Sequence, residues 1–134
     1  MSVNAAYEPT AEQRQEIDDW FANYDALVAA GNVEAMADQA MFPLNEVTDS
    51  KGFGIASATD RERFIAQMGG MGGVDMRSTR TPLFLSPALV FVVTDAEFGS
   101  GDETTSMRYG DLLIRTPDGW RFQTMVAGGF GDEM

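Results

Sequence analysis

Residues 24–36 read YDALVAAGNVEAM, and they join two predicted helices. The apolar side chains in this stretch continue a stripe that recurs at helical spacing upstream. Gly31 supplies the left-handed residue that commonly ends a helix, and Asn32 can cap the next one by accepting a backbone N–H. The stretch therefore predicts a long first helix over about 11–30 and a short second helix through about Met41.

The start of the first helix carries its own signal. Thr10 and Gln13 match a capping box, in which a hydroxyl and an amide side chain satisfy free backbone N–H groups. Residues 1–9, before this cap, are expected to form a loose arm. The apolar stripe that follows consists of Ile17, Trp20, Phe21, Tyr24, Leu27 and Val28.

A pair of short strands is expected between the second helix and a third. Pro43 should end the second helix, and residues 43–49 and 53–57 favour extended structure around a turn-forming cluster. Thr59 and Glu62 then form a second capping box, which starts the third helix. The glycine cluster after Met68 should end it.

From Val74 onward the pattern changes from helical to strand-like. Candidate strands cover 74–86, 88–99, 104–116 and 120–127, separated by clusters of Gly, Pro, Ser and Asp. Long strands with internal breaks favour a strongly bent sheet. Such a sheet cannot fill its own hollow side, so the first helix should close it. We expect a single α+β domain over residues 1–134, shaped as a cone whose open end binds small ligands.

Composition restricts the chemistry of the chain. Its 134 residues include no cysteine and no histidine, which excludes disulfides, thiolate metal sites and imidazole bases. A net charge of −12 argues against nucleic acid and anionic membranes as partners. No apolar run approaches the roughly 18 residues of a membrane span, and no signal-peptide pattern is seen. The expectation is a cytoplasmic protein that uses no metal or cofactor.

Several segments resemble the nuclear transport factor 2-like superfamily in their order along the chain. They are the stretch 24–36, the extended residues 42–49, the helix from Thr59 and the closing DGWRF at 118–122. The likeness covers about residues 10–130. It implies a cone-shaped, curved antiparallel sheet wrapped around a long N-terminal helix, a cystatin-like roll with three helices and about six strands. It implies no single activity, because this fold hosts ketosteroid isomerases, SnoaL-like polyketide cyclases, scytalone dehydratase and non-catalytic domains.

The resemblance to ketosteroid isomerases points to Tyr24 and Asp111. Those enzymes carry a Tyr seven residues before the glycine that ends the first helix, and an Asp eight residues before the glycine of the last hairpin. Tyr24 and Asp111 stand at these distances from Gly31 and Gly119. In that family the Tyr and a protonated Asp form an oxyanion hole. The plainer alternatives are a core tyrosine and a solvent-facing strand aspartate.

Proton transfer also needs a base, which the family places on the first strand after the second helix. Without gaps this position is Thr48, whereas a two-residue deletion would place Glu46 there. Asp49 is a further option at the turn, and Glu46 could equally be a solvated strand residue. The side chains expected to line the pocket are Trp20, Phe64, Phe91 and Met125.

Two other sets of charged residues are alternative candidate sites. Asp75 and Arg77 lie two apart, hence on one face of a strand, as a surface ion pair or as part of an Asp–Arg–Asp water site of the epoxide-hydrolase type. Arg80 is expected to reach Asp95 or Glu97 across the sheet.

Two functions follow from these observations. The first is a cofactor-free isomerase, cyclase or dehydratase that acts on a small hydrophobic carbonyl compound through Tyr24, Asp111 and Glu46. The second is a non-catalytic ligand-binding or homodimerisation domain, which the uncertain base and the absence of histidine favour. Strand 88–98 is apolar on both faces, consistent with a sheet covered on both sides, and the resemblance implies a homodimer through the outer face.

Overall fold

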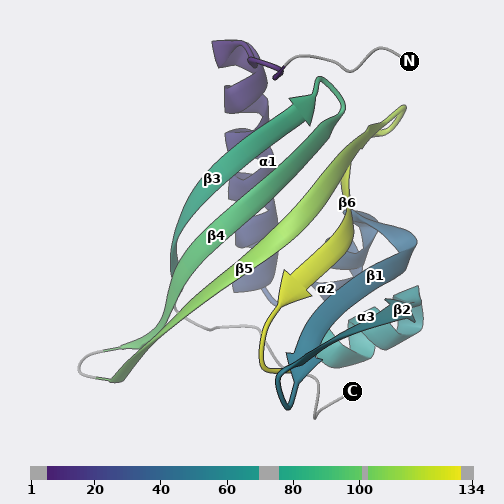
Figure 1. Ribbon diagram of the computed structural model, residues 1–134, viewed down its shortest axis with the longest axis vertical. Coiled ribbons are helices and arrows are strands. Elements are labelled where there is room, and N and C mark those ends of the chain that lie inside the picture. Colours follow the sequence, from purple (N-terminus) through teal and green to yellow (C-terminus); the bar gives the residue numbers. More distant parts are fainter. Residues whose placement is uncertain (1–5, 70–75, 101–102, 131–134) are drawn as a thin grey trace.

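The computed structural model describes residues 6–69, 76–100 and 103–130. Its helices are α1 (Ala11–Ala29), α2 (Val33–Asp38) and α3 (Arg61–Met68). Its strands are β1 (Ala40–Ser50), β2 (Phe53–Thr59), β3 (Met76–Ser86), β4 (Leu89–Ser100), β5 (Glu103–Thr116) and β6 (Gly119–Ala127). The expected α+β class, with its element order and its curved sheet, is confirmed (Figure 1).

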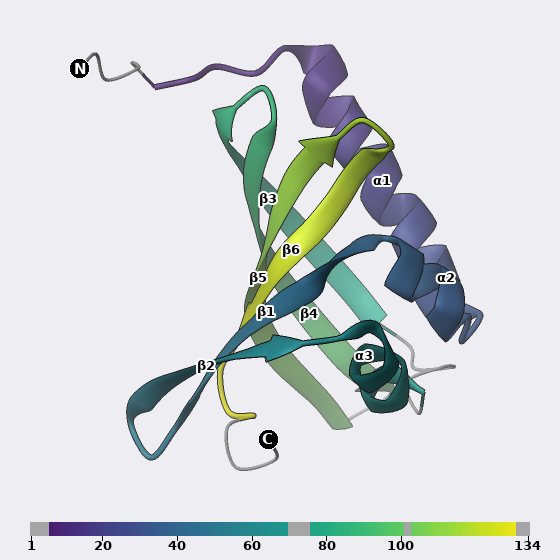
Figure 2. The ribbon, with the colours of Figure 1, turned by 90° about the vertical axis from the view of Figure 1, so that its right-hand side faces the viewer.

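The strands form one six-stranded sheet in the order β2-β1-β6-β5-β4-β3. Every neighbouring pair is antiparallel except β1 and β6, which run parallel. The sheet is therefore mixed, where the sequence suggested an antiparallel one. All three helices lie on one side of it (Figure 2). We call the face that packs on α1 the inner face, and the opposite face the outer face.

The helix ends follow the sequence signals with two differences. The Thr10 capping box forms with both of its hydrogen bonds, and Gly31 has a positive φ of 67°. The second helix ends earlier than expected, at Asp38, because β1 already begins at Ala40 and contains Pro43 behind a cis peptide bond.

The cap of α3 also differs from the expectation. Thr59 is buried and pairs with Leu44 in the β1–β2 ladder, so it still belongs to the strand. Asp60 caps α3 in its place, and its carboxylate accepts the backbone N–H of Arg63 at 2.8 Å.

The hydrophobic core lies between the helices and the inner face of the sheet. On β4 the alternation is clear, since Val90 and Val92 are fully buried while Phe91 between them points to the outer face. The buried apolar side chains of the core are Ile17, Phe21, Met36, Ala37, Leu44, Phe64, Phe84, Val90, Val92, Leu113, Trp120 and Phe122.

Part of the expected N-terminal arm is tied to this core. The Tyr7 hydroxyl donates to Gln13 Oε1 at 2.7 Å, and its ring centroid lies 6.4 Å from that of Phe84. Residues 1–5 lie outside the described residues. Among the described helices, none is long and apolar enough to cross a membrane.

Candidate ligand cavity

A cavity of about 520 Å³ lies between α1 and the inner face of the sheet, within the roughly 300–1,000 Å³ typical of small-molecule sites. All three helices, every strand except β2, and Phe130 contribute to its lining. Its walls are mainly apolar: Trp20, Phe21, Val28, Met36, Val47, Met68, Phe98, Met107, Phe122, Met125, Ala127 and Phe130. Its polar side chains are Tyr24, Asp25, Glu46, Thr48, Gln67, Arg80, Tyr109 and Asp111.

Five of the seven residues that the sequence assigned to the site or its lining face this cavity: Tyr24 and Trp20 from α1, Glu46 from β1, Asp111 from β5 and Met125 from β6. The sheet register explains why three of them meet. Asp111 pairs with Met125, and Met125 pairs in turn with Glu46. Directly paired residues point to the same face, so these three form a row across the inner face of β5, β6 and β1.

Two residues expected in the lining, Phe64 and Phe91, lie elsewhere. Phe64 is fully buried in the core, with its ring centroid 5.9 Å from those of both Phe42 and Phe122. Phe91 lies on the outer face and covers Gly110, where an added Cβ would stand 2.5 Å from the Phe91 ring. The prediction for Phe91 failed because strand alternation sends odd-numbered residues of this part of β4 outward.

Tyr24 combines a packed ring with a hydroxyl at the cavity. Its ring stacks on Trp20 at 5.4 Å with an interplanar angle of 5°, and meets Phe122 edge-on at 5.4 Å. Burial raises the pKa of Tyr24, and the charge of Asp111 raises it further. The hydroxyl therefore stays protonated, and within the described part of the chain it makes no hydrogen bond. It is available as a donor to a ligand.

Asp111 is a buried carboxyl group that is 7% exposed. Burial raises its pKa from 3.8 to about 7, and the nearby charge of Arg80 limits the rise. Near neutral pH a large share of this group is therefore protonated and can donate a hydrogen bond, which an ordinary aspartate cannot. No side-chain partner for it is found among the described residues, so its hydrogen-bonding capacity is also left to a ligand.

Arg80 reaches a partner that the sequence did not indicate. Its Nη1 and Nη2 donate to the two carboxylate oxygens of Asp25 on α1, at 2.6 and 2.9 Å. The guanidinium carbon also lies 4.3 Å from the ring centroid of Phe21. The predicted partners Asp95 and Glu97 are wrong because they sit on the outer face, whereas Arg80 pairs with the buried Thr94 and points inward.

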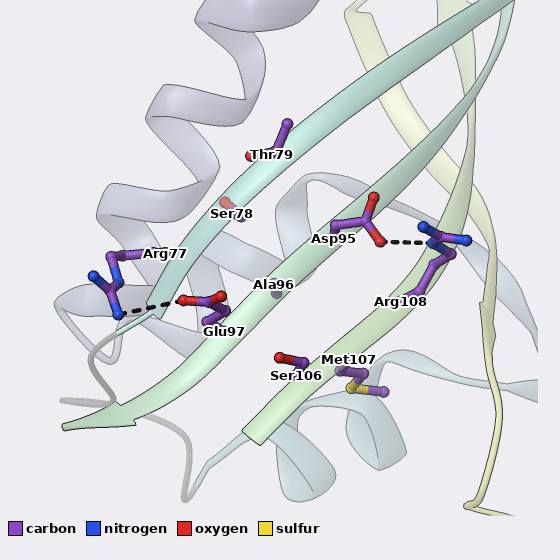
Figure 3. A pocket seen from close by; sticks show the side chains of 9 residues that line it. All are labelled: Arg77, Ser78, Thr79, Asp95, Ala96, Glu97, Ser106, Met107 and Arg108. Atoms are coloured by element: carbon purple, nitrogen blue, oxygen red, sulfur yellow. Dashed lines mark hydrogen bonds and ion pairs between the residues drawn. The ribbon is translucent and has the colours of Figure 1, made fainter. Parts of the chain in front are cut away.

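The outer face has a shallow hollow of a different kind beside the start of β3, the end of β4 and the start of β5 (Figure 3). Two ion pairs cross it, Arg77–Glu97 at 3.3 Å and Arg108–Asp95 at 2.6 Å. All four side chains are exposed, so each pair contributes little to stability. Asp75, considered beside Arg77, lies outside the described residues. We find no group of three or more acidic residues that could hold a metal ion in the described ranges.

The comparisons with known proteins give structural matches only. No family model matches the chain, and neither does any curated protein. An NTF2-like protein of unknown function from Pseudomonas putida superposes with a TM-score of 0.69 at 12% identity, covering 90% of this chain and 89% of that one.

Two further structures are similar in shape. A candidate scytalone dehydratase from Novosphingobium aromaticivorans gives a TM-score of 0.64 at 16% identity, over 86% of this chain and 82% of the other. A candidate calcium/calmodulin-dependent protein kinase II association domain from Xanthomonas campestris gives 0.65 at 15% identity, over 98% and 99%. At these identities the likeness concerns architecture, and with the strand order and the cavity it identifies the fold of this chain as that of the nuclear transport factor 2-like (NTF2-like) proteins.

Proposed function

We propose that this protein binds a small, largely apolar carbonyl compound in the cavity and moves a proton on it without a cofactor, as an isomerase, cyclase or dehydratase. The observation that carries the proposal is the pair Tyr24 and Asp111. Both line one cavity, where Asp111 is buried and Tyr24 is partly buried, and both have their hydrogen-bonding groups free among the described residues.

The two groups suit a developing oxyanion. A carbonyl oxygen that accepts hydrogen bonds from the Tyr24 hydroxyl and the protonated Asp111 carboxyl gains stabilisation as negative charge moves onto it. Burial disfavours the charged form of each group, so Tyr24 stays neutral and a large share of Asp111 is protonated near neutral pH. The apolar walls exclude water, which strengthens these hydrogen bonds.

Glu46 would be the carboxylate that takes the proton. It lies on the same row as Asp111, with Met125 between them, so their Cα atoms are on the order of 10 Å apart from strand spacing. A substrate with its oxygen at Asp111 would thus present its α-carbon over Met125, toward Glu46. In the orientation that satisfies both neighbours, the Gln67 amide donates to Glu46 Oε1 at 2.9 Å and accepts from Arg63 Nε at 3.3 Å. These contacts would orient the base.

The experiment uses α-proton exchange, which needs no knowledge of the natural product. The protein is incubated with 2-tetralone, a bicyclic ketone, in deuterium oxide, and loss of the α-hydrogen signals is followed by NMR. Glu46 would take the proton, and solvent deuterium would return to the enolate carbon. We expect exchange well above the buffer rate. It should fall about 10²–10³-fold in Asp111→Leu, which removes a donor, and about 10²–10⁴-fold in Glu46→Gln, which removes the base.

The matched control is Glu97→Gln, which removes a carboxylate from the outer face of the same sheet. It should exchange at the wild-type rate. Wild-type exchange no faster than buffer, or equal exchange in all four proteins, would rule the proposal out.

The second candidate is a non-catalytic domain that binds a ligand and forms a homodimer. The exposed leucines of the outer face favour the association part of this reading, since Leu83, Leu85 and Leu89 are 50%, 63% and 42% exposed. Ligand binding to the cavity without any α-proton exchange would select this candidate over the enzyme.

A further inference from the structure

Arg80 places a cation in the wall of a mainly apolar cavity. Its side chain is only 13% exposed, and its salt-bridge partner Asp25 is 34% exposed. A buried guanidinium needs a compensating charge, and Asp25 supplies it by engaging both terminal nitrogens. Burial disfavours the charged guanidinium, but the hydrogen bonds and charge of Asp25, together with the nearby Tyr109, outweigh that cost, so the pKa of Arg80 is raised and the cation persists.

The side chains that line the cavity therefore carry no net positive charge. Arg80 is the one cationic side chain in the described lining, and Asp25 cancels it. Glu46 and Asp111 add carboxyl groups and no compensating cation. A ligand carboxylate entering this cavity would lose its hydration and meet net negative charge. A neutral oxygen acceptor would meet the hydroxyls and the protonated carboxyl without that repulsion.

We propose that Asp25 determines the class of ligand: by masking the guanidinium of Arg80, it makes the cavity take a neutral oxygen-bearing molecule and reject a carboxylate of the same shape. This inference rests on the proposed function, because it concerns the ligand of the same cavity. Asp25 acts through Arg80 and is a specificity-determining residue outside the proton-transfer set.

The geometry indicates how the cavity changes when the Asp25 carboxylate no longer neutralises Arg80. Asp25→Asn keeps the shape and one acceptor oxygen of the side chain but removes its charge. The guanidinium should stay in place, since it remains stacked over Phe21 at 4.3 Å. Its Nε already has no hydrogen-bond partner among the described residues. The variant therefore leaves a cation in the cavity wall with unused donors, and such a site favours a carboxylate.

The experiment compares two probes of matched shape, the ketone 2-acetonaphthone and the carboxylate 2-naphthoate. Each is titrated into the full-length protein by calorimetry at about pH 6, where Asp111 is mainly protonated given its pKa of about 7. We expect the wild type to bind the ketone at least tenfold more tightly. In Asp25→Asn the ratio of the two affinities should shift at least tenfold toward the carboxylate. In Asp25→Asn/Arg80→Gln it should return toward the wild-type ratio.

The chain offers a matched control on its outer face. Asp95 forms a 2.6 Å ion pair with Arg108, away from the cavity, so Asp95→Asn should leave the ratio unchanged. Because both probes are measured on the same protein sample, partial unfolding of a variant does not alter the ratio.

The outcomes separate this inference from the proposed function. If the ketone binds but Asp25→Asn shifts the ratio less than twofold, or if the wild type binds naphthoate as tightly as the ketone, the role of Asp25 is refuted while the cavity remains a ligand site. If neither probe binds either protein, both proposals fail.

Discussion

Asp111 lies in an environment that differs strongly from that of an ordinary, solvated aspartate. Its pKa is 3.8 when unperturbed and about 7 in the fold, because burial disfavours the carboxylate. The folded state therefore holds this proton more tightly than the unfolded state does. By linkage, the contribution of Asp111 to stability decreases as pH rises from about 4 to about 7 and stays low above that range.

This direction of the pH dependence leads to a prediction for Asp111→Asn, a variant that keeps the shape of the side chain and cannot ionise. Since one pKa unit corresponds to about 1.4 kcal/mol, the variant should gain up to about 4 kcal/mol over the wild type between pH 4 and pH 8. Denaturant unfolding at a series of pH values measures the difference. The exposed Asp95→Asn is the control and should track the wild type. If the difference in unfolding free energy between the wild type and Asp111→Asn does not change with pH, the buried environment assigned to Asp111 is contradicted.

The same carboxyl group predicts how activity depends on pH. Only the protonated form of Asp111 can donate to the substrate oxygen, so α-proton exchange should decline above about pH 7, close to the pKa of Asp111. Asp111→Asn retains an N–H donor and should lose this alkaline decline while keeping part of the rate. A pH profile of 2-tetralone exchange by both proteins tests it, and an unchanged alkaline limb in the variant would assign the limb to another group.

At this scale the sequence marked some cavity-lining residues and missed others for a definite reason. Tyr24 and Asp111 were marked by the resemblance to ketosteroid isomerases, because their distances from Gly31 and Gly119 match the pattern of those enzymes. The Asp25–Arg80 pair joins residues 55 positions apart with no local pattern. Strand alternation alone could have excluded Asp95 as the partner of Arg80, once Thr94 was placed on the inner face.

Among the strands, β4 and β5 pack closely at Gly110 of β5, which the Phe91 ring of β4 covers. An added Cβ on Gly110 would stand 2.5 Å from Phe91 Cζ, a distance that real Cβ contacts essentially never show, and 3.0 Å from Cε1. Gly110→Ala should therefore displace the Phe91 ring and cost about 1–2 kcal/mol of unfolding free energy. With Phe91→Leu in the background the cost should shrink, giving a non-additive double-mutant cycle.

Gly54 is the control for this prediction. It also lies in a strand, β2, but an added Cβ there meets nothing within 4 Å. Gly54→Ala should change stability by less than about 0.5 kcal/mol, as surface substitutions usually do. Equal costs at the two glycines, or strict additivity with Phe91→Leu, would mean that the ring does not pack over Gly110 in solution.

Element positions were largely predictable from local patterns, whereas pairing was not. The caps and glycines marked α1 closely, and alternation marked the four later strands to within about two residues. The parallel pairing of β1 with β6 joins the start of the sheet to the end of the chain, and no local periodicity specifies such a partner. The predicted second helix is too long because Ala40 and Met41 favour a helix by propensity, whereas pairing with β6 places them in β1.

At the scale of the whole molecule, the outer face of the sheet is charged toward one end and apolar toward the other. Toward the start of β3, the end of β4 and the start of β5, the face carries the Arg77–Glu97 and Arg108–Asp95 pairs. Around the β3–β4 turn it instead exposes Leu83, Leu85 and Leu89. Exposed apolar patches of this kind mark association sites. A net charge of −12 makes two copies repel each other at long range, so their association needs an apolar contact surface. We therefore expect a homodimer to form through this leucine patch.

The dimer prediction is tested by light scattering coupled to size-exclusion chromatography at micromolar concentration. The wild type should elute as a dimer, and Leu85→Glu should shift it to a monomer, because a carboxylate would be buried without a partner in the interface. Phe53→Glu is the control: Phe53 is 75% exposed at the β1–β2 turn, away from the leucine patch, and its variant should stay dimeric. A monomeric wild type would refute the interface, and equal dissociation by both variants would move it to another surface. Because the cavity is on the inner face, α-proton exchange by the Leu85→Glu monomer should persist, which separates assembly from chemistry.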